Sequence, residues 1–287
     1  MVNSPLNKIE HSIFDKYNLN VYVKRDDLIH PLISGNKWRK GHYLLKHIKE
    51  NGYSTVITFG GAYSNHIHSF SYACNQLGIK SIGIIRGEEL KHKELNKTLS
   101  FAKDQGMELI FVSREEYKKR YDSEYCNNLS LKYNAYIVPE GGTTKFAING
   151  FKDMVEEVRN FLDNALYFVP CGSGGTIGGI NANLKNEEFV YGVNVVKGNE
   201  KDLDLVIKSM SNINKFCIVS DYHFNGYAKT NKELEDFICF FEKEFGIEIE
   251  SVYSGKMFFA FFDMIKKNKI NNRNVVLCHT GGLQGKR

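Results

Sequence analysis

The fold is indicated most clearly by the stretch Thr55-Val56-Ile57-Thr58-Phe59-Gly60-Gly61-Ala62-Tyr63-Ser64-Asn65-His66. Its first five residues are β-branched or apolar, as in a buried strand, and the glycine pair predicts a turn. Ser64 and Asn65 are residue types that cap helices, and a helix is expected over residues 65–77. A second strand is expected at 81–85, so these segments form a β-α-β unit whose strands we expect to be parallel.

The same alternation of short strands and helices continues along the chain. It predicts an α/β fold with largely parallel, twisted sheets flanked by helices. In sheets of this kind, ligands lie outside the carboxyl ends of the strands. Further strands are expected at 109–112, 135–138, 166–169, 190–195, 217–219 and 275–278, and further helices at 37–51, 95–104, 115–131, 146–162 and 177–184.

The length of 287 residues is enough for one large domain or two medium ones. The glycine pairs 60–61 and 141–142 bracket several β/α units. We therefore expect a small domain over residues 41–142, with residues 1–40 and 143–287 forming a large, ligand-binding domain. A cleft between two such lobes would suit a small-molecule site.

Composition argues against several classes of protein. The formal net charge is only +5 and no compact basic block occurs, so we expect no nucleic-acid partner. None of the six cysteines lies in a C-x-x-C pair, so we expect no metal site, and reduced thiols suit a cytoplasmic location. The start of the chain lacks a signal-peptide pattern, and the apolar run 257–262 is too short to span a membrane.

The glycine-rich run Cys171-Gly172-Ser173-Gly174-Gly175-Thr176 follows a predicted strand and precedes a predicted helix. Converging backbone amides and a helix N-terminus bind phosphate, although a plain tight turn would have the same composition. The run lacks the Gly-Lys-Ser/Thr ending of a nucleoside-triphosphate loop. Ile177 also stands where the dinucleotide fingerprint needs a glycine, so a phosphate monoester fits best.

Lys37, in Ser34-Gly35-Asn36-Lys37-Trp38-Arg39-Lys40, is the second candidate feature. A lysine that forms a Schiff base has to be partly neutral, which burial or nearby cations can achieve. Arg39 and Lys40 supply such cations. Taken alone, Lys37 is better explained as a solvated lysine at a helix start. Together with a phosphate cradle, it indicates a covalently held phosphorylated aldehyde, pyridoxal phosphate (PLP).

Two further segments offer polar groups in pairs. Ser64 and Asn65 follow a buried strand, where helix capping alone could explain them. The turn 250–256 brings Tyr253 and Ser254 together before an aromatic helix whose apolar stripe we expect to lie in the core.

Seven motifs occur in an order that resembles the fold type II PLP enzymes, the tryptophan synthase β-subunit superfamily. Within it they look most like the D-cysteine desulfhydrase and 1-aminocyclopropane-1-carboxylate (ACC) deaminase family. The resemblance covers nearly the whole chain and implies a two-lobed fold whose large domain binds PLP. The motifs are Lys24-Arg25-Asp26-Asp27, Gly35-Asn36-Lys37, Gly61-Ala62-Tyr63-Ser64-Asn65-His66, Pro139-Glu140-Gly141-Gly142, Gly172–Thr176, Val252-Tyr253-Ser254-Gly255-Lys256 and His279-Thr280-Gly281-Gly282.

The resemblance implies which residues bind the cofactor. Lys37 would hold PLP covalently and move a proton. Asn65 would bond to the 3′ oxygen of PLP, and Ser254 would approach its pyridine nitrogen. The phosphate would lie in a cradle formed by Gly172, Ser173, Gly174, Gly175 and Thr176.

The resemblance also implies a substrate site for a small amino acid. Ser64 would contact the substrate carboxylate or transfer a proton, and Asn65 and His66 would lie beside it. Tyr227 and Tyr253 would line the pocket and, with Lys37 and Ser64, take part in catalysis. Relatives of this fold are commonly dimers, so the resemblance also implies a homodimer.

Two departures from the pattern bear on the reaction. ACC deaminases carry a glutamate after the pocket tyrosine, where this chain has Ser254, and tend to carry a glutamine where it has His66. Both favour D-cysteine desulfhydrase-like αβ-elimination, which gives pyruvate, ammonia and sulfide. ACC deaminase is the alternative in the same class, and a non-catalytic protein that binds PLP or another phosphate ligand is the alternative outside it.

Overall fold

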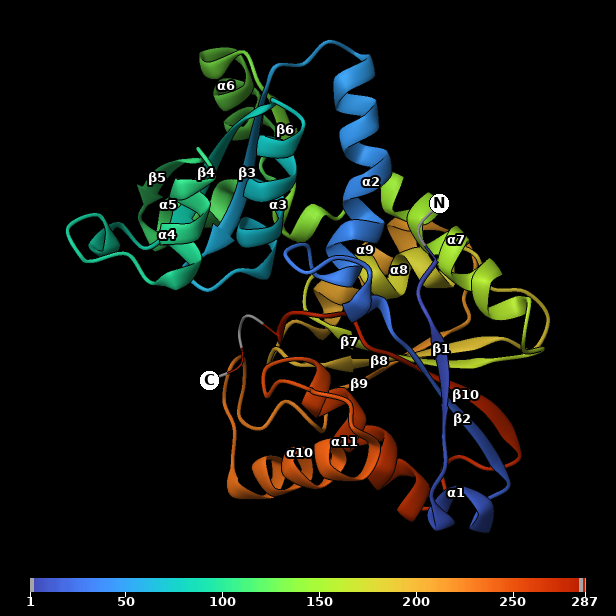
Figure 1. Cartoon of the computed structure of the whole chain (residues 1–287). Coiled ribbons are helices and arrows are strands. Elements are labelled where there is room, and N and C mark those ends of the chain that lie inside the picture. The colour runs from blue at the N-terminus through green and yellow to red at the C-terminus, as the bar shows by residue number, and fades with distance from the viewer. Residues whose placement is uncertain (1–2, 284–285, 287) are drawn as a thin grey trace. The chain divides into compact units, whose positions relative to one another are not determined.

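The computed structural model describes residues 3–283 and 286. It confirms the α/β class and the largely parallel sheets (Figure 1). The chain forms two compact units, one of residues 1–29 with 148–287 and one of residues 30–147. Lys37 therefore belongs to the 30–147 unit, whereas the predicted boundary at residue 40 placed it with the large domain. The assignment of a PLP-binding domain and a small domain stays a prediction.

The 30–147 unit contains a parallel four-stranded sheet in the order β5-β4-β3-β6. β3 lies between β4 and β6, and its Thr58 is in register with Gly83 on one side and Val138 on the other. The unit's elements are α2 (Gly35–Glu50), β3 (Thr55–Gly61), α3 (Asn65–Gln76), β4 (Lys80–Arg86), α4 (Lys97–Asp104), β5 (Glu108–Val112), α5 (Arg114–Lys118), α6 (Ser123–Tyr133) and β6 (Tyr136–Val138).

Both faces of this sheet are covered, because side chains alternate along β3. Val56 packs in a cluster with Leu44 of α2 and Ile67 of α3. Ile57 and Phe59 point to the other face, where the aromatic residues of α5 and α6 pack. A strand buried on both faces explains the nearly continuous apolar run from which the fold was predicted.

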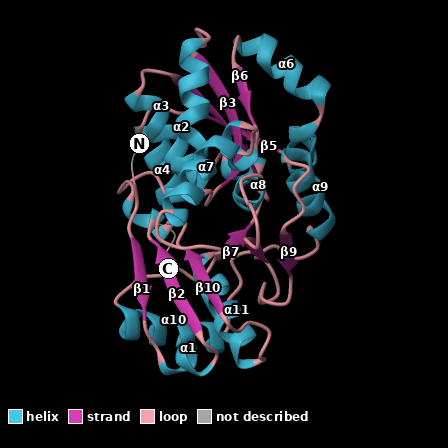
Figure 2. Cartoon of the chain, turned by 90° about the vertical axis from the view of Figure 1, so that its right-hand side faces the viewer, coloured by secondary structure: helices cyan, strands magenta, loops and turns pink. Residues whose placement is uncertain are grey.

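The other unit contains a six-stranded sheet in the order β1-β2-β10-β7-β8-β9, in which only the β1–β2 pair is antiparallel. β1, β2 and β10 run side by side in Figure 2. The unit's elements are β1 (Leu6–Ile9), α1 (Ser12–Lys16), β2 (Leu19–Lys24), most of α7 (Phe146–Arg159), β7 (Leu166–Cys171), α8 (Gly175–Asn181), β8 (Phe189–Asn194), α9 (Glu200–Met210), β9 (Phe216–Val219), α10 (Lys232–Phe245), α11 (Ser254–Lys266) and β10 (Arg273–Cys278).

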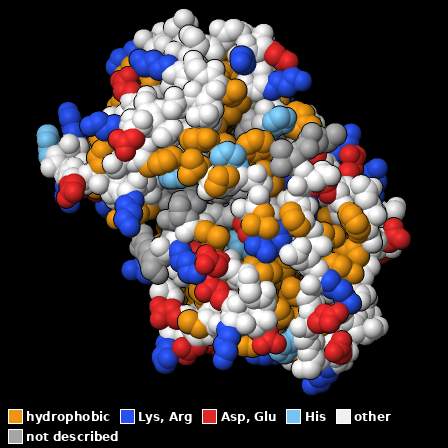
Figure 3. Space-filling view, viewed as in Figure 1, with side chains coloured by type: hydrophobic (Ala, Val, Ile, Leu, Met, Phe, Trp, Pro, Cys, Tyr) orange, Lys and Arg blue, Asp and Glu red, His pale blue; other side chains and the backbone are white. Residues whose placement is uncertain are grey.

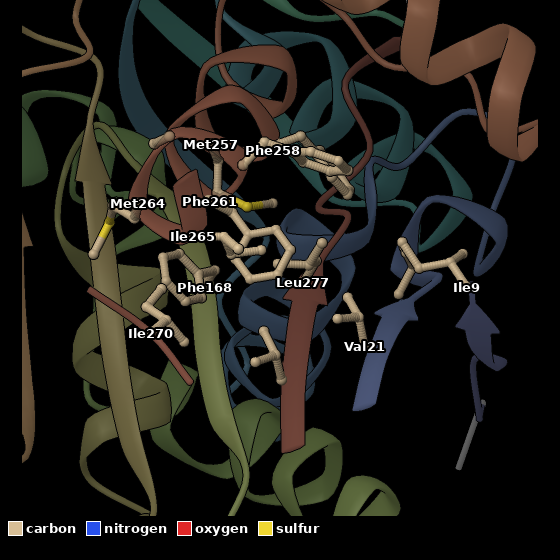
Figure 4. Packing of buried hydrophobic residues seen from close by; sticks show 14 of the residues in the cluster. Ile9, Val21, Phe168, Met257, Phe258, Phe261, Met264, Ile265, Ile270 and Leu277 are labelled. Carbon is tan, nitrogen blue, oxygen red and sulfur yellow. The ribbon is translucent and has the colours of Figure 1, made fainter. Parts of the chain in front are cut away.

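The aromatic stripe of α11 lies in the core of this unit, as predicted. Phe258 and Phe261 are fully buried, and Phe261 contacts Phe168 of β7 with ring centroids 5.3 Å apart. Figure 4 shows this packing around Leu277 of β10. Burial of each such side chain contributes about 1.5–3 kcal/mol. The stripe therefore anchors the segment that carries Tyr253 and Ser254 at the start of α11.

The structure corrects two local expectations. The predicted turn at Gly60–Gly61 is wrong, because β3 runs through Gly61. A Cβ atom at Gly60 would lie 2.4 Å from Ile67 Cγ1, so this glycine allows α3 to approach the strand. The predicted helix over 115–131 is two helices, since the Asp122 side chain accepts from Tyr125 N at 2.8 Å and starts α6.

Candidate functional site

Lys37 lies in the first turn of α2, and backbone contacts fix its position. Ser34 precedes the helix, and its carbonyl oxygen accepts from Lys37 N at 2.8 Å. Ser34 N donates to Ser69 Oγ of α3 at 3.1 Å, which links the start of α2 to the second turn of α3. The predicted loop-to-helix setting of Lys37 is confirmed, with α2 starting two residues earlier than expected.

A small cavity of about 20 Å³ adjoins Lys37 within this unit. Burial lowers the pKa of Lys37 to about 8, against the opposing effect of the Glu140 carboxylate. A share of the amine is therefore neutral near pH 7, as a nucleophilic lysine requires. The cavity is lined by Ile33, Lys37, Lys40, Gly41, Leu44, Leu45, His66, Ser69, Phe70, Ala73, Gly141 and Gly142.

This pKa leads to a pH dependence that can be measured. Below about pH 8 the Lys37 amine is mostly protonated and cannot attack an aldehyde. The rate at which apoprotein takes up PLP should therefore rise about tenfold per pH unit up to about pH 8 and level off above it. Stopped-flow absorbance of PLP between pH 6 and 10 checks this. A profile still rising at pH 10 would show an ordinary, unshifted lysine.

Glu140 is held firmly beside this cavity. Tyr117 Oη donates to its Oε1 at 2.8 Å, and Arg120 Nε donates to its Oε2 at 2.7 Å. The Arg120 guanidinium also lies over the Tyr117 ring, 4.9 Å from its centroid. The carboxylate therefore has a fixed position from which it raises the pKa of Lys37.

Glu140→Gln should lower the pKa of Lys37 further below about 8, because it removes the anion that favours the ammonium. The midpoint of the PLP-uptake profile should move to lower pH. Glu115→Gln is a matched control, since Glu115 is exposed and pairs with Lys118 on its own helix. An unmoved midpoint in Glu140→Gln would mean that Glu140 does not act on Lys37.

Ser64, Asn65 and His66 lie at the start of α3. Ser64 Oγ accepts from Ile67 N at 3.3 Å, so the capping role expected from the sequence is present. His66 Nε2 lies 2.7 Å from Thr58 Oγ1, whose hydroxyl also lies 3.0 Å from Val138 O. Burial, followed by the charges of Lys37 and Lys40, lowers the pKa of His66 well below its usual range, so its ring is neutral.

The glycine-rich loop joins β7 to α8 in the other compact unit. Gly174 has a φ of +80°, which favours glycine, and a Cβ atom there would lie 3.1 Å from Val206 Cγ1, a tight contact. A Cβ atom at Gly172 would lie 3.2 Å from Tyr253 Cε1. Without side chains at these two positions, the loop can offer backbone amides and the hydroxyls of Ser173 and Thr176. These groups fit a phosphate.

Tyr227 and Tyr253 form an aromatic pair next to this loop. Their ring centroids are 5.7 Å apart and their planes are nearly perpendicular, while the Tyr253 ring also packs on Gly172. Tyr227 is 40% exposed, so one ring of the pair is accessible to a ligand.

Ser254 is fully buried and bonded to Glu250, a residue to which the sequence reading gave no role. Glu250 N donates to Ser254 Oγ at 2.9 Å, and Ser254 Oγ donates to Glu250 Oε1 at 3.1 Å. The same carboxylate accepts from the backbone N of residues 252, 253 and 254 at 2.6–2.8 Å. Burial raises the pKa of Glu250, and these donors oppose that shift.

The predicted site residues thus lie in two groups, one in each compact unit. Lys37, Ser64, Asn65 and His66 lie in the 30–147 unit, whereas Gly172–Thr176, Tyr227, Tyr253 and Ser254 lie in the other. Their joint role around one cofactor stays a prediction. Glu140 and Lys256 lie within the quoted motifs and Glu250 begins the turn 250–256, but no role was predicted for any of the three. Their burial, or their contacts with aromatic residues distant in sequence, become visible only in the folded chain.

Charges are interspersed on the face seen in Figure 3, where Lys and Arg side chains alternate with Asp and Glu. Within residues 3–283 and 286, no helix is both long and apolar enough to cross a membrane.

The family described as pyridoxal-phosphate dependent enzyme matches residues 2–281. A Thermotoga maritima protein named putative 1-aminocyclopropane-1-carboxylate deaminase is 34% identical, over 94% of this chain and 91% of its own length. An Arabidopsis thaliana protein named bifunctional D-cysteine desulfhydrase/1-aminocyclopropane-1-carboxylate deaminase is 29% identical, over 92% of this chain and 73% of its own. A crystal structure described as an ACC deaminase homologue superposes with a TM-score of 0.82 at 28% identity, covering 99% of this chain and 90% of that one.

Proposed function

The chain belongs to the pyridoxal-phosphate dependent enzyme family, and on this premise we propose that it is a lyase acting on a small amino acid. The proposed reaction is D-cysteine desulfhydrase-like αβ-elimination. The Cα–H and Cβ–S bonds of cysteine break, and water completes the conversion to pyruvate, ammonia and sulfide. Its cofactor is PLP, which when bound supplies an electron sink for negative charge at the α-carbon.

The residues present fit this cofactor. Lys37 would hold it, Asn65 would bond to its 3′ oxygen, and the loop Gly172–Thr176 would bind its phosphate. Ser254 would lie at its pyridine nitrogen. The phosphate assignment is supported by the loop's composition, because glycines at 172 and 174 leave the backbone amides uncovered by side chains, and Gly174 has a φ of +80° that favours glycine.

The observation that carries the proposal is the partly neutral amine of Lys37, a half-buried residue that lines the cavity. A base with a pKa of about 8 can both accept and return a proton near neutral pH. We assign Lys37 Nζ to the substrate's α-proton and Ser64 Oγ to the substrate carboxylate or to proton transfer. Tyr227 and Tyr253 would exclude water from one side of the substrate. The neutral ring of His66 would lie beside it and contribute no charge.

ACC deaminase is the second candidate. The name of the Thermotoga maritima relative favours it, since that protein matches this chain over nearly its whole length. Against it stand Ser254 and His66, where the resemblance to ACC deaminases would place a glutamate and a glutamine.

One assay panel separates the candidates. Purified protein loaded with PLP is given D-cysteine, L-cysteine or ACC, and sulfide, pyruvate and 2-oxobutyrate are measured. We expect sulfide and pyruvate in equal amounts from cysteine. Formation of 2-oxobutyrate from ACC without sulfide from either cysteine would favour the deaminase. Bound PLP with no turnover of any amino acid would indicate the non-catalytic alternative.

A further inference from the structure

Lys256 is a buried cation that the proposed reaction does not use. It is the third residue of α11, its side chain is fully buried, and one residue, Gly255, separates it from Ser254. Nζ donates to the carbonyl oxygens of His223 and Gly226, each at 2.9 Å. It also lies 6.0 Å from the centroid of the Phe224 ring. One side chain thus joins the start of α11 to the turn at residues 223–226.

This turn has a backbone that is unfavourable without outside support. Phe224 and Ala228 have φ values of 52° and 56°, a region that residues other than glycine and asparagine rarely adopt, while Asn225 and Gly226 have φ values of 68° and 130°. Within the turn, Gly226 N donates to His223 O at 3.0 Å, and Lys229 N donates to Gly226 O at 3.2 Å. Lys256 bonds to the same two carbonyl oxygens, so it stabilises this conformation directly.

The conformation of the turn determines where Tyr227 lies. Tyr227 immediately follows Gly226, and its ring meets the Tyr253 ring at 71° with centroids 5.7 Å apart. Tyr253 in turn packs on Gly172 of the glycine-rich loop. A continuous set of contacts therefore leads from Lys256 through the turn to Tyr227, and from Tyr227 through Tyr253 to the loop.

We propose that Lys256 is a positioning residue that holds Tyr227 against Tyr253 beside the glycine-rich loop, and so shapes the substrate side of the site. The inference rests on the proposed function in one respect, that Tyr227 and Tyr253 line the substrate pocket. Burial lowers the pKa of Lys256 to about 8. A neutral amine keeps two N–H donors for its two carbonyl partners, so the contacts should persist above that pH.

The test compares Lys256→Met, which keeps the length of the side chain but has no donors, with Lys256→Gln, which keeps two donors on a shorter side chain. Lys266→Met is the matched control, because Lys266 is exposed near the other end of α11. In holoenzyme labelled with 3-fluorotyrosine, the ¹⁹F resonance of Tyr227 is assigned by Tyr227→Phe. We expect it to shift or broaden in Lys256→Met, to be partly restored in Lys256→Gln and to stay unchanged in the control.

Kinetics supply the second readout. In Lys256→Met we expect KM for the amino acid to rise about tenfold while kcat changes less than about threefold, because binding is affected more than proton transfer at Lys37. If Lys256→Met does not fold, KM and the Tyr227 resonance are compared between Lys256→Gln and the Lys266→Met control, and that comparison tests the inference. An unmoved Tyr227 resonance with unchanged KM would overturn the inference. If the wild-type protein shows no turnover, the proposed function has failed, and the resonance alone still tests the contact.

Discussion

Lys37→Ala should lose the visible absorption of bound PLP and reduce turnover by at least about 10²–10⁴-fold. The variant removes the covalent attachment and the proposed base at once. The substitution should change the free energy of unfolding little, since Lys37 lies at a helix start and alanine has a high helix propensity.

Lys40→Met is the control for Lys37→Ala, because Lys40 lines the same cavity and its Nζ donates to Gly141 O at 3.3 Å. We expect Lys40→Met to keep the PLP band. Added methylamine should restore part of the activity of Lys37→Ala, as a free amine can replace a missing lysine. Full turnover in Lys37→Ala would contradict the role given to this residue.

Glu250→Gln should lower the free energy of unfolding by about 1–3 kcal/mol. The carboxylate accepts from three backbone N–H groups and from the Ser254 hydroxyl, all in a buried turn. An amide has one acceptor oxygen, and its NH₂ group would face at least one of these donors. Each buried donor left without a partner costs about 1–3 kcal/mol.

Urea unfolding of Glu250→Gln beside Glu244→Gln measures this difference. Glu244 is exposed on α10 and close in sequence, so its replacement should leave the unfolding midpoint unchanged. The slope with denaturant should stay the same in both variants, which would show that only stability has changed. A Glu250→Gln midpoint equal to that of the control would mean that the carboxylate contributes little to the turn.

The fold was predictable because its signals are local. The buried strand at β3, the cap at Ser64 and the helix that follows are each visible in a few consecutive residues. Two errors came from side-chain contacts between residues close in sequence, which the run of residue types does not reveal. Gly60 is glycine because Ile67 approaches it, and the break before α6 depends on a single aspartate cap.

The site was predictable in its residue types but less so in its supporting contacts. Ser254 was interpreted as a hydroxyl in place of a carboxylate, yet the Glu250 carboxylate lies 3.1 Å from that hydroxyl. The hydrogen bonds from Lys256 to residues 223 and 226 span about thirty positions of sequence, and no local sequence pattern predicts them.

The most direct measurement is to locate PLP on the chain. Borohydride reduction of the holoprotein fixes PLP covalently to the lysine that holds it, and peptide mass spectrometry then identifies that lysine. We predict one label, on Lys37, which increases as pH rises through about 8. A label on Lys40 or Lys256 with Lys37 unmodified, or no label in protein saturated with PLP, would contradict the assignment of Lys37 as the cofactor lysine.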